Sequence, residues 1–137
     1  MSKIKGSCLC GQVTYSTTEA EPTMMAICHC TDCQKQNGAA FSINVLVPTK
    51  TITFKGASLS QYIVNGTSGT PVTRNFCGNC GSPLSTELDA FGELSAIKAG
   101  TLEDSSWVKP GVQIWCDTAQ PWGKLDDSIE CAAGNPL

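Results

Sequence analysis

Cys77-Gly78-Asn79-Cys80 is a cysteine pair on a glycine-rich turn, and two further cysteine clusters precede it: Cys8-Leu9-Cys10 and Cys28-His29-Cys30-Thr31-Asp32-Cys33. In a tetrahedral zinc–sulfur site each bond is about 2.3 Å, which leaves neighbouring sulfurs about 3.8 Å apart. A C-x-C pair on an extended strand puts both side chains on one face, and a C-x-x-C turn folds the chain back so that its sulfurs meet. Each cluster can therefore supply half of a metal site or more.

The spacing leaves the pairing of the clusters open. Cys28, Cys30 and Cys33 can form a three-thiolate site by themselves, and a closed four-thiolate site can be built from Cys8, Cys10, Cys77 and Cys80. Two closed sites need eight ligands, whereas the clusters supply seven. Either one site takes a further group, with Cys116, Cys131 and His29 as candidates, or it keeps an open position, which is the mark of a catalytic zinc.

Simpler interpretations compete with that of a catalytic zinc site. His29 lies between two cysteines of a C-x-C pair, so alternation turns its side chain away from their metal and we expect it to pack instead. All seven clustered cysteines can be structural, or the C-x-x-C can be a redox pair, although the βαβ context of a thioredoxin-like motif is missing. Cys116 and Cys131 are expected to be free thiols.

Composition predicts one mainly β domain over residues 1–137 that metal helps to stabilise. The chain has 137 residues, and its 41% of hydrophobic residues includes nine cysteines, so few side chains remain for a core. A zinc site contributes folding free energy directly and can compensate for a thin core. Many short strands and few helices fit such a fold.

Turn residues divide the chain into short apolar runs that predict strands. A hairpin is expected around Gly11, with Val13 and Tyr15 on one face, and a short helix over 31–36 ends at Gly38. A second helix is expected over 126–132. The expected strands are 4–10, 12–18, 23–28, 41–47, 51–54, 58–64, 70–76, 84–88, 94–99 and 112–116.

Charge and the N-terminal sequence narrow the function class. The net charge is −3 with nine Lys and Arg residues in all, so no basic surface for nucleic acid or an anionic membrane is expected. No apolar stretch resembles a signal peptide or a membrane span, which predicts a cytoplasmic protein. A reducing compartment makes a disulfide framework unexpected.

Together the clusters and their flanks resemble the glutathione-dependent formaldehyde-activating enzyme family, which shares its domain with centromere protein V. The resemblance is carried by Gly6-Ser7-Cys8-Leu9-Cys10-Gly11-Gln12-Val13, by 28–33 with Gly38 and Phe41, by Phe76-Cys77-Gly78-Asn79-Cys80-Gly81-Ser82-Pro83-Leu84, and by Ile114-Trp115 and Pro121-Trp122. These pieces span nearly the whole chain in order.

The resemblance implies a β-tent-like fold of several small antiparallel sheets around two zinc ions. It implies that Cys8, Cys10, Cys77 and Cys80 hold a structural zinc and that Cys28, Cys30 and Cys33 hold a catalytic one. The implied activity is that of a carbon–sulfur lyase that joins formaldehyde to glutathione, or cleaves the adduct. The implied partner is a small glutathione-like thiol adduct. A thiol bound in the open position would lose its proton to become a nucleophile.

Other residues receive simpler interpretations. Arg74, Lys35 and Lys98 can contact an anionic ligand, but we expect solvated surface charges, and Asp32 is expected at a helix end. Trp107, Trp115 and Trp122 are expected to cover the core or sheet edges. The competing functions are a non-catalytic, zinc-stabilised protein-binding module and a zinc-buffering or redox-responsive protein.

Overall fold

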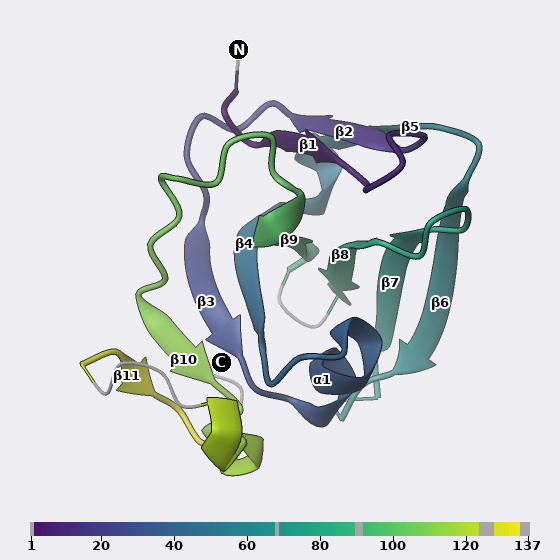
Figure 1. The fold of residues 1–137 in the computed structure, drawn as a ribbon. Coiled ribbons are helices and arrows are strands. Elements are labelled where there is room, and N and C mark those ends of the chain that lie inside the picture. Colours follow the sequence, from purple (N-terminus) through teal and green to yellow (C-terminus); the bar gives the residue numbers. More distant parts are fainter. Residues whose placement is uncertain (1, 68, 90–91, 124–127, 135–137) are drawn as a thin grey trace.

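The part of the chain that the structure describes is mainly β, as predicted, and contains one α-helix and several single-turn 3-10 helices (Figure 1). The computed structural model describes residues 2–67, 69–89, 92–123 and 128–134. Its strands form two sheets, one of three strands and one of eight. The small sheet lies across one end of the large sheet, and helix α1 lies at the opposite end (Figure 1).

The small sheet contains the predicted hairpin. β1 (Lys5–Ser7) pairs antiparallel with β2 (Thr14–Thr17), which pairs antiparallel with β5 (Ile52–Lys55). Val13 and Tyr15 are both buried, as their shared face predicts.

The first strand ends earlier than expected, at Ser7. Cys8 and Cys10 therefore lie in a turn, where the N–H of Cys8 donates to the carbonyl of Val13 (3.0 Å) and Gly11 adopts a φ of 80°. A positive φ favours glycine, so Gly11 fixes this turn beside the cysteines.

The large sheet has the order β11-β10-β3-β4-β9-β8-β7-β6. Its pairings are antiparallel except those of β10, which runs parallel to both β3 and β11. Its strands are β3 (Met24–Cys28), β4 (Ser42–Pro48), β6 (Leu59–Asn65), β7 (Pro71–Cys77), β8 (Pro83–Leu88), β9 (Leu94–Lys98), β10 (Val112–Ile114) and β11 (Glu130–Cys131).

Helix α1 (Thr31–Asn37) connects β3 to β4. It begins after Cys30 and ends at Gly38, whose φ of 72° allows the left-handed turn that closes it. The predicted helix and its glycine stop are confirmed. The 3-10 helices are η1 (Thr49–Thr51), η3 (Ala99–Thr101), η4 (Cys116–Thr118) and η5 (Pro121–Gly123).

The helix expected over 126–132 is wrong where the structure describes it. Residues 124–127 lie outside the described part of the chain, whereas Glu130–Cys131 form strand β11. The N–H of Ala132 donates to the carbonyl of Gln113 (2.8 Å), so pairing with β10 extends this segment. A distant partner decided the conformation, and the local pattern did not contain it.

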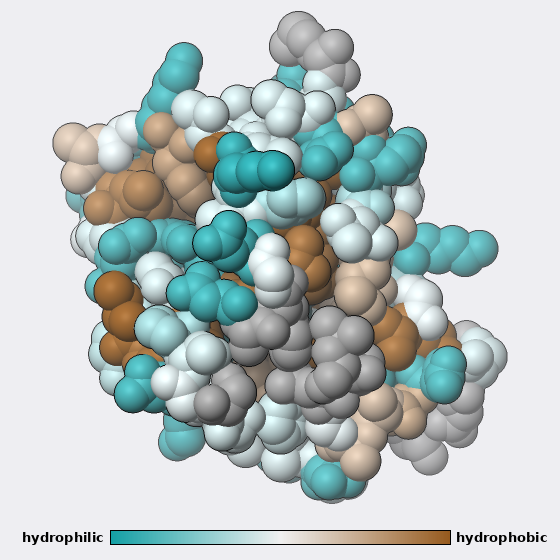
Figure 2. Space-filling model, turned by 180° about the vertical axis from the view of Figure 1, so that it is seen from behind, coloured by the Kyte–Doolittle hydropathy of each residue, from teal (hydrophilic) through white to brown (hydrophobic). Residues whose placement is uncertain are grey.

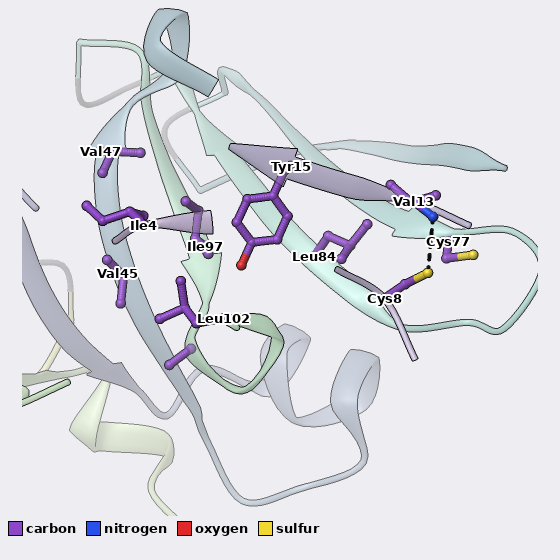
Figure 3. Packing of buried hydrophobic residues seen from close by; sticks show 11 residues of the cluster. Ile4, Cys8, Val13, Tyr15, Val45, Val47, Cys77, Leu84, Ile97 and Leu102 are labelled. Carbon is purple, nitrogen blue, oxygen red and sulfur yellow. Dashed lines mark hydrogen bonds between the residues drawn. The ribbon is translucent and has the colours of Figure 1, made fainter. Parts of the chain in front are cut away.

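A compact apolar cluster joins the two sheets (Figure 3). Ile4, Val45, Val47, Leu84 and Ile97 are almost completely buried in it. Cys8 and Cys77 lie at one end of this cluster beside Val13 and Leu84 (Figure 3), so one cysteine of each turn is part of the core.

The back of the molecule carries separate apolar patches among polar residues (Figure 2). The most exposed large apolar side chains in the described residues are Leu9, Tyr62, Ile63 and Trp122. Tyr62 and Ile63 belong to β6, the edge strand of the large sheet. Among the described residues, no helix has both the length and the apolar character needed to span a membrane.

Candidate metal centres and the adjoining cavity

The first candidate centre joins two turns that lie far apart in the sequence. The sulfur atoms of Cys8, Cys10, Cys77 and Cys80 all lie within 4.8 Å of one another. The Cys8 and Cys10 sulfurs are 3.6 Å apart, and those of Cys10 and Cys77 are 3.8 Å apart. These separations match the edge of a tetrahedral zinc–thiolate site, so the four residues fit a zinc ion.

Hydrogen bonds to sulfur surround this centre. The N–H of Val13 donates to Sγ of Cys8 and the amide of Asn79 donates to Sγ of Cys10, each over 3.3 Å. Hydrogen bonds from the side chain and backbone of Ser82 lower the pKa of Cys80 to about 5. Donors of this kind favour thiolates, the form in which cysteine binds a metal.

The second candidate centre lies where β3 runs into α1. Cys28 ends β3, Cys30 is the residue before the helix and Cys33 is buried in its first turn. Their sulfurs lie within 4.8 Å of one another, and within the described residues the group includes no fourth Cys, His, Asp or Glu. The N–H of Cys33 donates to Sγ of Cys30 (3.3 Å). The donor set fits zinc, with one position left for another ligand.

The pKa values of the three cysteines in this centre depend on the hydrogen bonds among them. Hydrogen bonds with Cys28 and Cys30, together with the positive charge of Lys98, hold the pKa of Cys33 well below its usual range. Hydrogen bonds with Cys30 and Cys33 raise the pKa of Cys28. Without a cation the three sulfurs therefore share their protons unequally, and a bound cation would favour the thiolate form of all three.

His29 faces away from both centres, as alternation predicts. Its Nε2 lies 2.8 Å from Oε1 of Gln113 on β10, and its ring packs against that of Phe41 with centroids 5.7 Å apart. The backbone carbonyl of His29 accepts from Nε2 of Gln34 (2.7 Å) and from Oγ1 of Thr118 (2.9 Å). His29 thus anchors the three-cysteine loop and does not contribute a ligand.

The three-cysteine centre opens on a cavity of about 300 Å³. Its walls come from α1, from β7, β8 and β9 of the large sheet, and from η4. Residues of the wall that bear on function are Cys28, Cys30, Cys33, Arg74, Thr86 and Lys98. The four-cysteine centre does not line this cavity.

Two of the expected surface charges are in fact buried in this cavity wall. Arg74 and Lys98 are each only 8% exposed, whereas Lys35 on α1 is exposed as expected. Nη1 of Arg74 donates to Oε1 of Gln36 (2.8 Å) and Nζ of Lys98 to Oδ1 of Asn44 (3.2 Å). Burial lowers the pKa of Lys98, and the nearby charge of Cys33 opposes this. Strand alternation places Arg74 on the face of Val72 and Lys98 on the face of Ala96, but only the neighbouring strands show that these faces line a cavity.

Cys116 and Cys131 form a disulfide, so the expectation of free thiols is wrong. The N–H of Cys116 donates to the carbonyl of Ala132 (2.9 Å), which places η4 against the segment after β11. Their separation of 15 residues carries no motif, and only the pairing of β10 with β11 brings them together.

The predictions for the tryptophans and for Asp32 are confirmed in part. Trp107 packs against the main core, and Asp32 lies in the first turn of α1, as expected. Trp115 lines the cavity, and Trp122 is 69% exposed, so it covers little of the fold.

Comparison with known proteins adds the family context. The family model described as "Glutathione-dependent formaldehyde-activating enzyme" matches residues 3–118. A curated protein of Halomonas elongata, named "Putative glutathione-dependent formaldehyde-activating enzyme", is 28% identical over 141 residues, covering 97% of this chain and 88% of the relative. A crystal structure of a Rhodobacter sphaeroides protein has the same fold, with a TM-score of 0.59 and 22% identity over 78% of this chain and 92% of its own.

Proposed function

Because the chain belongs to the glutathione-dependent formaldehyde-activating enzyme family, we propose that it is a zinc-dependent carbon–sulfur lyase acting on a thiol–aldehyde adduct. The observation that carries the proposal is the group of Cys28, Cys30 and Cys33, which faces a cavity of about 300 Å³ with room for a further ligand. In the forward direction the substrates are a glutathione-like thiol and formaldehyde.

The two cysteine groups would divide the work between structure and chemistry. Cys8, Cys10, Cys77 and Cys80 form a closed set of four donors at the margin of the core, with Cys8 and Cys77 buried in it, which suits a structural zinc. Cys28, Cys30 and Cys33 would hold the second zinc. Bound there, zinc supplies the positive charge that lowers the pKa of a coordinating thiol.

Thiol activation suits this donor set better than activation of the aldehyde. Three thiolate donors neutralise much of the metal's charge and weaken it as a Lewis acid toward a carbonyl oxygen. In the forward reaction the thiol proton leaves and the sulfur electron pair forms a bond to the formaldehyde carbon. The electrons of the carbonyl π bond move to oxygen, which takes up a proton. The product is an S-hydroxymethyl thioether, and the reverse sequence cleaves it.

The chain's own residues would orient the loop and shape its electrostatics. Gln34 and Thr118 hold the backbone carbonyl of His29 between two of the three cysteines. Lys98, buried beside Cys33, would offset the excess negative charge of three thiolates around a divalent ion. These contacts keep the three sulfurs turned toward the cavity.

The direct test measures adduct formation with zinc-loaded protein. Carbon-13 formaldehyde and glutathione are mixed with the protein, and NMR exchange spectroscopy follows exchange between free and S-hydroxymethyl carbon. We expect Cys30→Ser to abolish the acceleration and to bind one zinc fewer while it stays folded. Full activity in Cys30→Ser would overturn the catalytic assignment. If glutathione fails, the same measurement is repeated over a panel of thiols.

The second candidate is a zinc-stabilised protein-binding module, and the edge strand β6 favours it. Tyr62 and Ile63 expose 62% and 59% of their surface on a strand whose outer edge is unpaired within the described sheet. Edge strands with exposed apolar side chains can pair with another chain. This alternative predicts two bound zinc ions, no acceleration with any thiol, and a partner lost on Ile63→Lys.

A further inference from the structure

The cavity beside the three cysteines has two polar side chains on its wall, Arg74 and Thr86, that activation of a thiol does not require. Arg74 on β7 and Thr86 on β8 are directly paired across the two strands, and both line the cavity. Paired residues on neighbouring strands project to the same face of a sheet. Their side chains therefore form one polar spot on the cavity wall.

Arg74 has a charge that the described residues do not balance with a carboxylate. The ion pairs in the described part of the chain are Lys3 with Glu21 and Lys5 with Glu103. Within the described residues, the Arg74 guanidinium donates to the neutral amide oxygen of Gln36. Asp32 and Asp89 line the same cavity without forming an ion pair to Arg74. Arginine stays charged even when buried, and its five donors match a carboxylate in a two-pronged geometry.

Thr86 supplies the second and independent observation. Its side chain is only 4% exposed, and its hydroxyl has no hydrogen-bond partner among the residues that the structure describes. Leaving a buried hydroxyl unsatisfied costs about 1–3 kcal/mol, so such a group calls for an explanation. A ligand oxygen in the cavity would accept its hydrogen bond.

The neighbouring cation has a different function. Lys98 lies two residues after Ala96, the partner of Thr86 on β9, so it shares the inward face of the sheet. Its charge acts on Cys33, Cys28 and Cys30. Because Lys98 interacts with the three cysteines, Arg74 is the cation of the cavity wall that can pair with a negatively charged group of a ligand.

We propose that Arg74 and Thr86 form a carboxylate-binding subsite, and that the thiol substrate of the three-cysteine centre carries a carboxylate close to its sulfur. The inference rests on the proposed function and narrows its substrate class. The guanidinium would take the carboxylate through its donors that do not face Gln36, and the Thr86 hydroxyl would donate to the same group. The cavity volume of about 300 Å³ favours a compact thiol acid at this spot.

The test compares two small thiols that differ in one group. Mercaptoacetate carries the carboxylate, and 2-mercaptoethanol has a hydroxyl in its place. Each is titrated into protein whose zinc has been replaced by cobalt, and the change in the cobalt absorption bands gives the affinity. A charge-assisted pair in a cavity contributes enough for a preference of about tenfold for mercaptoacetate in the unmodified chain.

Three variants locate the source of the preference. Arg74→Gln should reduce it to less than about twofold. Thr86→Val keeps the side-chain shape and breaks no hydrogen bond among the described residues, and it should reduce the preference about threefold. Lys35→Gln removes the same charge from the exposed face of α1 and should leave the preference unchanged. If Arg74→Gln does not fold, Thr86→Val decides.

Each outcome has one meaning. Equal affinity for the two thiols in the unmodified chain, or a preference that survives in Thr86→Val and Arg74→Gln alike, refutes the subsite and leaves thiol activation standing. A cobalt spectrum that neither thiol alters refutes the proposed function, and the substrate class falls with it.

Discussion

Removal of the Cys116–Cys131 disulfide should lower the free energy of unfolding by an amount that depends on the length of the loop it closes. The two cysteines are 15 residues apart, and closing a loop of this length in the unfolded chain corresponds to about 3 kcal/mol on the chain-entropy model. Cys131 is exposed and Cys116 is half-buried, so replacing both by serine removes little packing. We therefore expect the free energy of unfolding of Cys116→Ser/Cys131→Ser to be about 3 kcal/mol lower than that of the unmodified chain.

Urea unfolding of the zinc-loaded proteins measures this difference. With a slope of about 2 kcal/mol per molar urea, the midpoint should fall by about 1.5 M. The double serine variant is better than a dithiol reductant, because a dithiol would also compete for the zinc. Seven reactive thiols after denaturation and metal removal, against nine in a chain treated with reductant, would establish the bond in the unmodified protein. Equal midpoints for the two proteins would refute the reasoning.

The same variant should keep both metal sites. Thr118 of η4 donates to the carbonyl of His29, but this hydrogen bond does not depend on the disulfide, which joins η4 to the segment after β11. Zinc analysis should therefore give the same metal content with and without the bond. A lost zinc would show that the disulfide supports the three-cysteine loop directly.

The remaining predictions concern the metal centres and the core. Cys80→Ser should lose zinc and unfold, because its site joins two distant turns within the core, whereas Cys30→Ser should lose one zinc and keep its fold; zinc analysis and circular dichroism separate the two. Leu84→Ala should destabilise by about 3–4 kcal/mol, since Leu84 is 0% exposed, and Leu9→Ala, at 88% exposed, should change the urea midpoint by less than about 0.3 M. Burial raises the pKa of Tyr15 to about 12, above the value of 10.0 in an unfolded chain, so the stability that the neutral Tyr15 contributes is complete below pH 10 and is lost as the pH rises toward 12. The free energy of unfolding should therefore fall by about 2 kcal/mol between pH 10 and pH 12, and the fall should be smaller in Tyr15→Phe.

The sequence predicted the strands of the large sheet well apart from β11, because each of the others has its own apolar run and turn residues. The runs expected at 58–64 and 94–99 correspond to β6 and β9 within one residue at each end. The cysteine groups followed from the family resemblance. Spacing alone left their pairing open, since it does not show which turns meet across the core.

What the sequence did not predict depends on distant partners. Arg74 and Lys98 look like ordinary surface charges along the chain, and their burial follows from the strands that flank them. The disulfide depends on β10 running parallel to β11, a pairing that no local pattern contains. Long-range register decided each of these features.

These features depend on pairings between strands far apart in the chain, whereas each cysteine cluster is local. The C-x-C and C-x-x-C pairs can be recognised in the chain because each lies in one local turn, although the contact between the two turns of the four-cysteine centre is long-range. The wall of the cavity instead combines residues of α1, β7, β8, β9 and η4, each positioned by its neighbours. Arg74 and Thr86 belong to this wall and to no motif. Under the two proposals above, the cysteines hold the metal and activate the thiol, whereas Arg74 and Thr86 select among thiols.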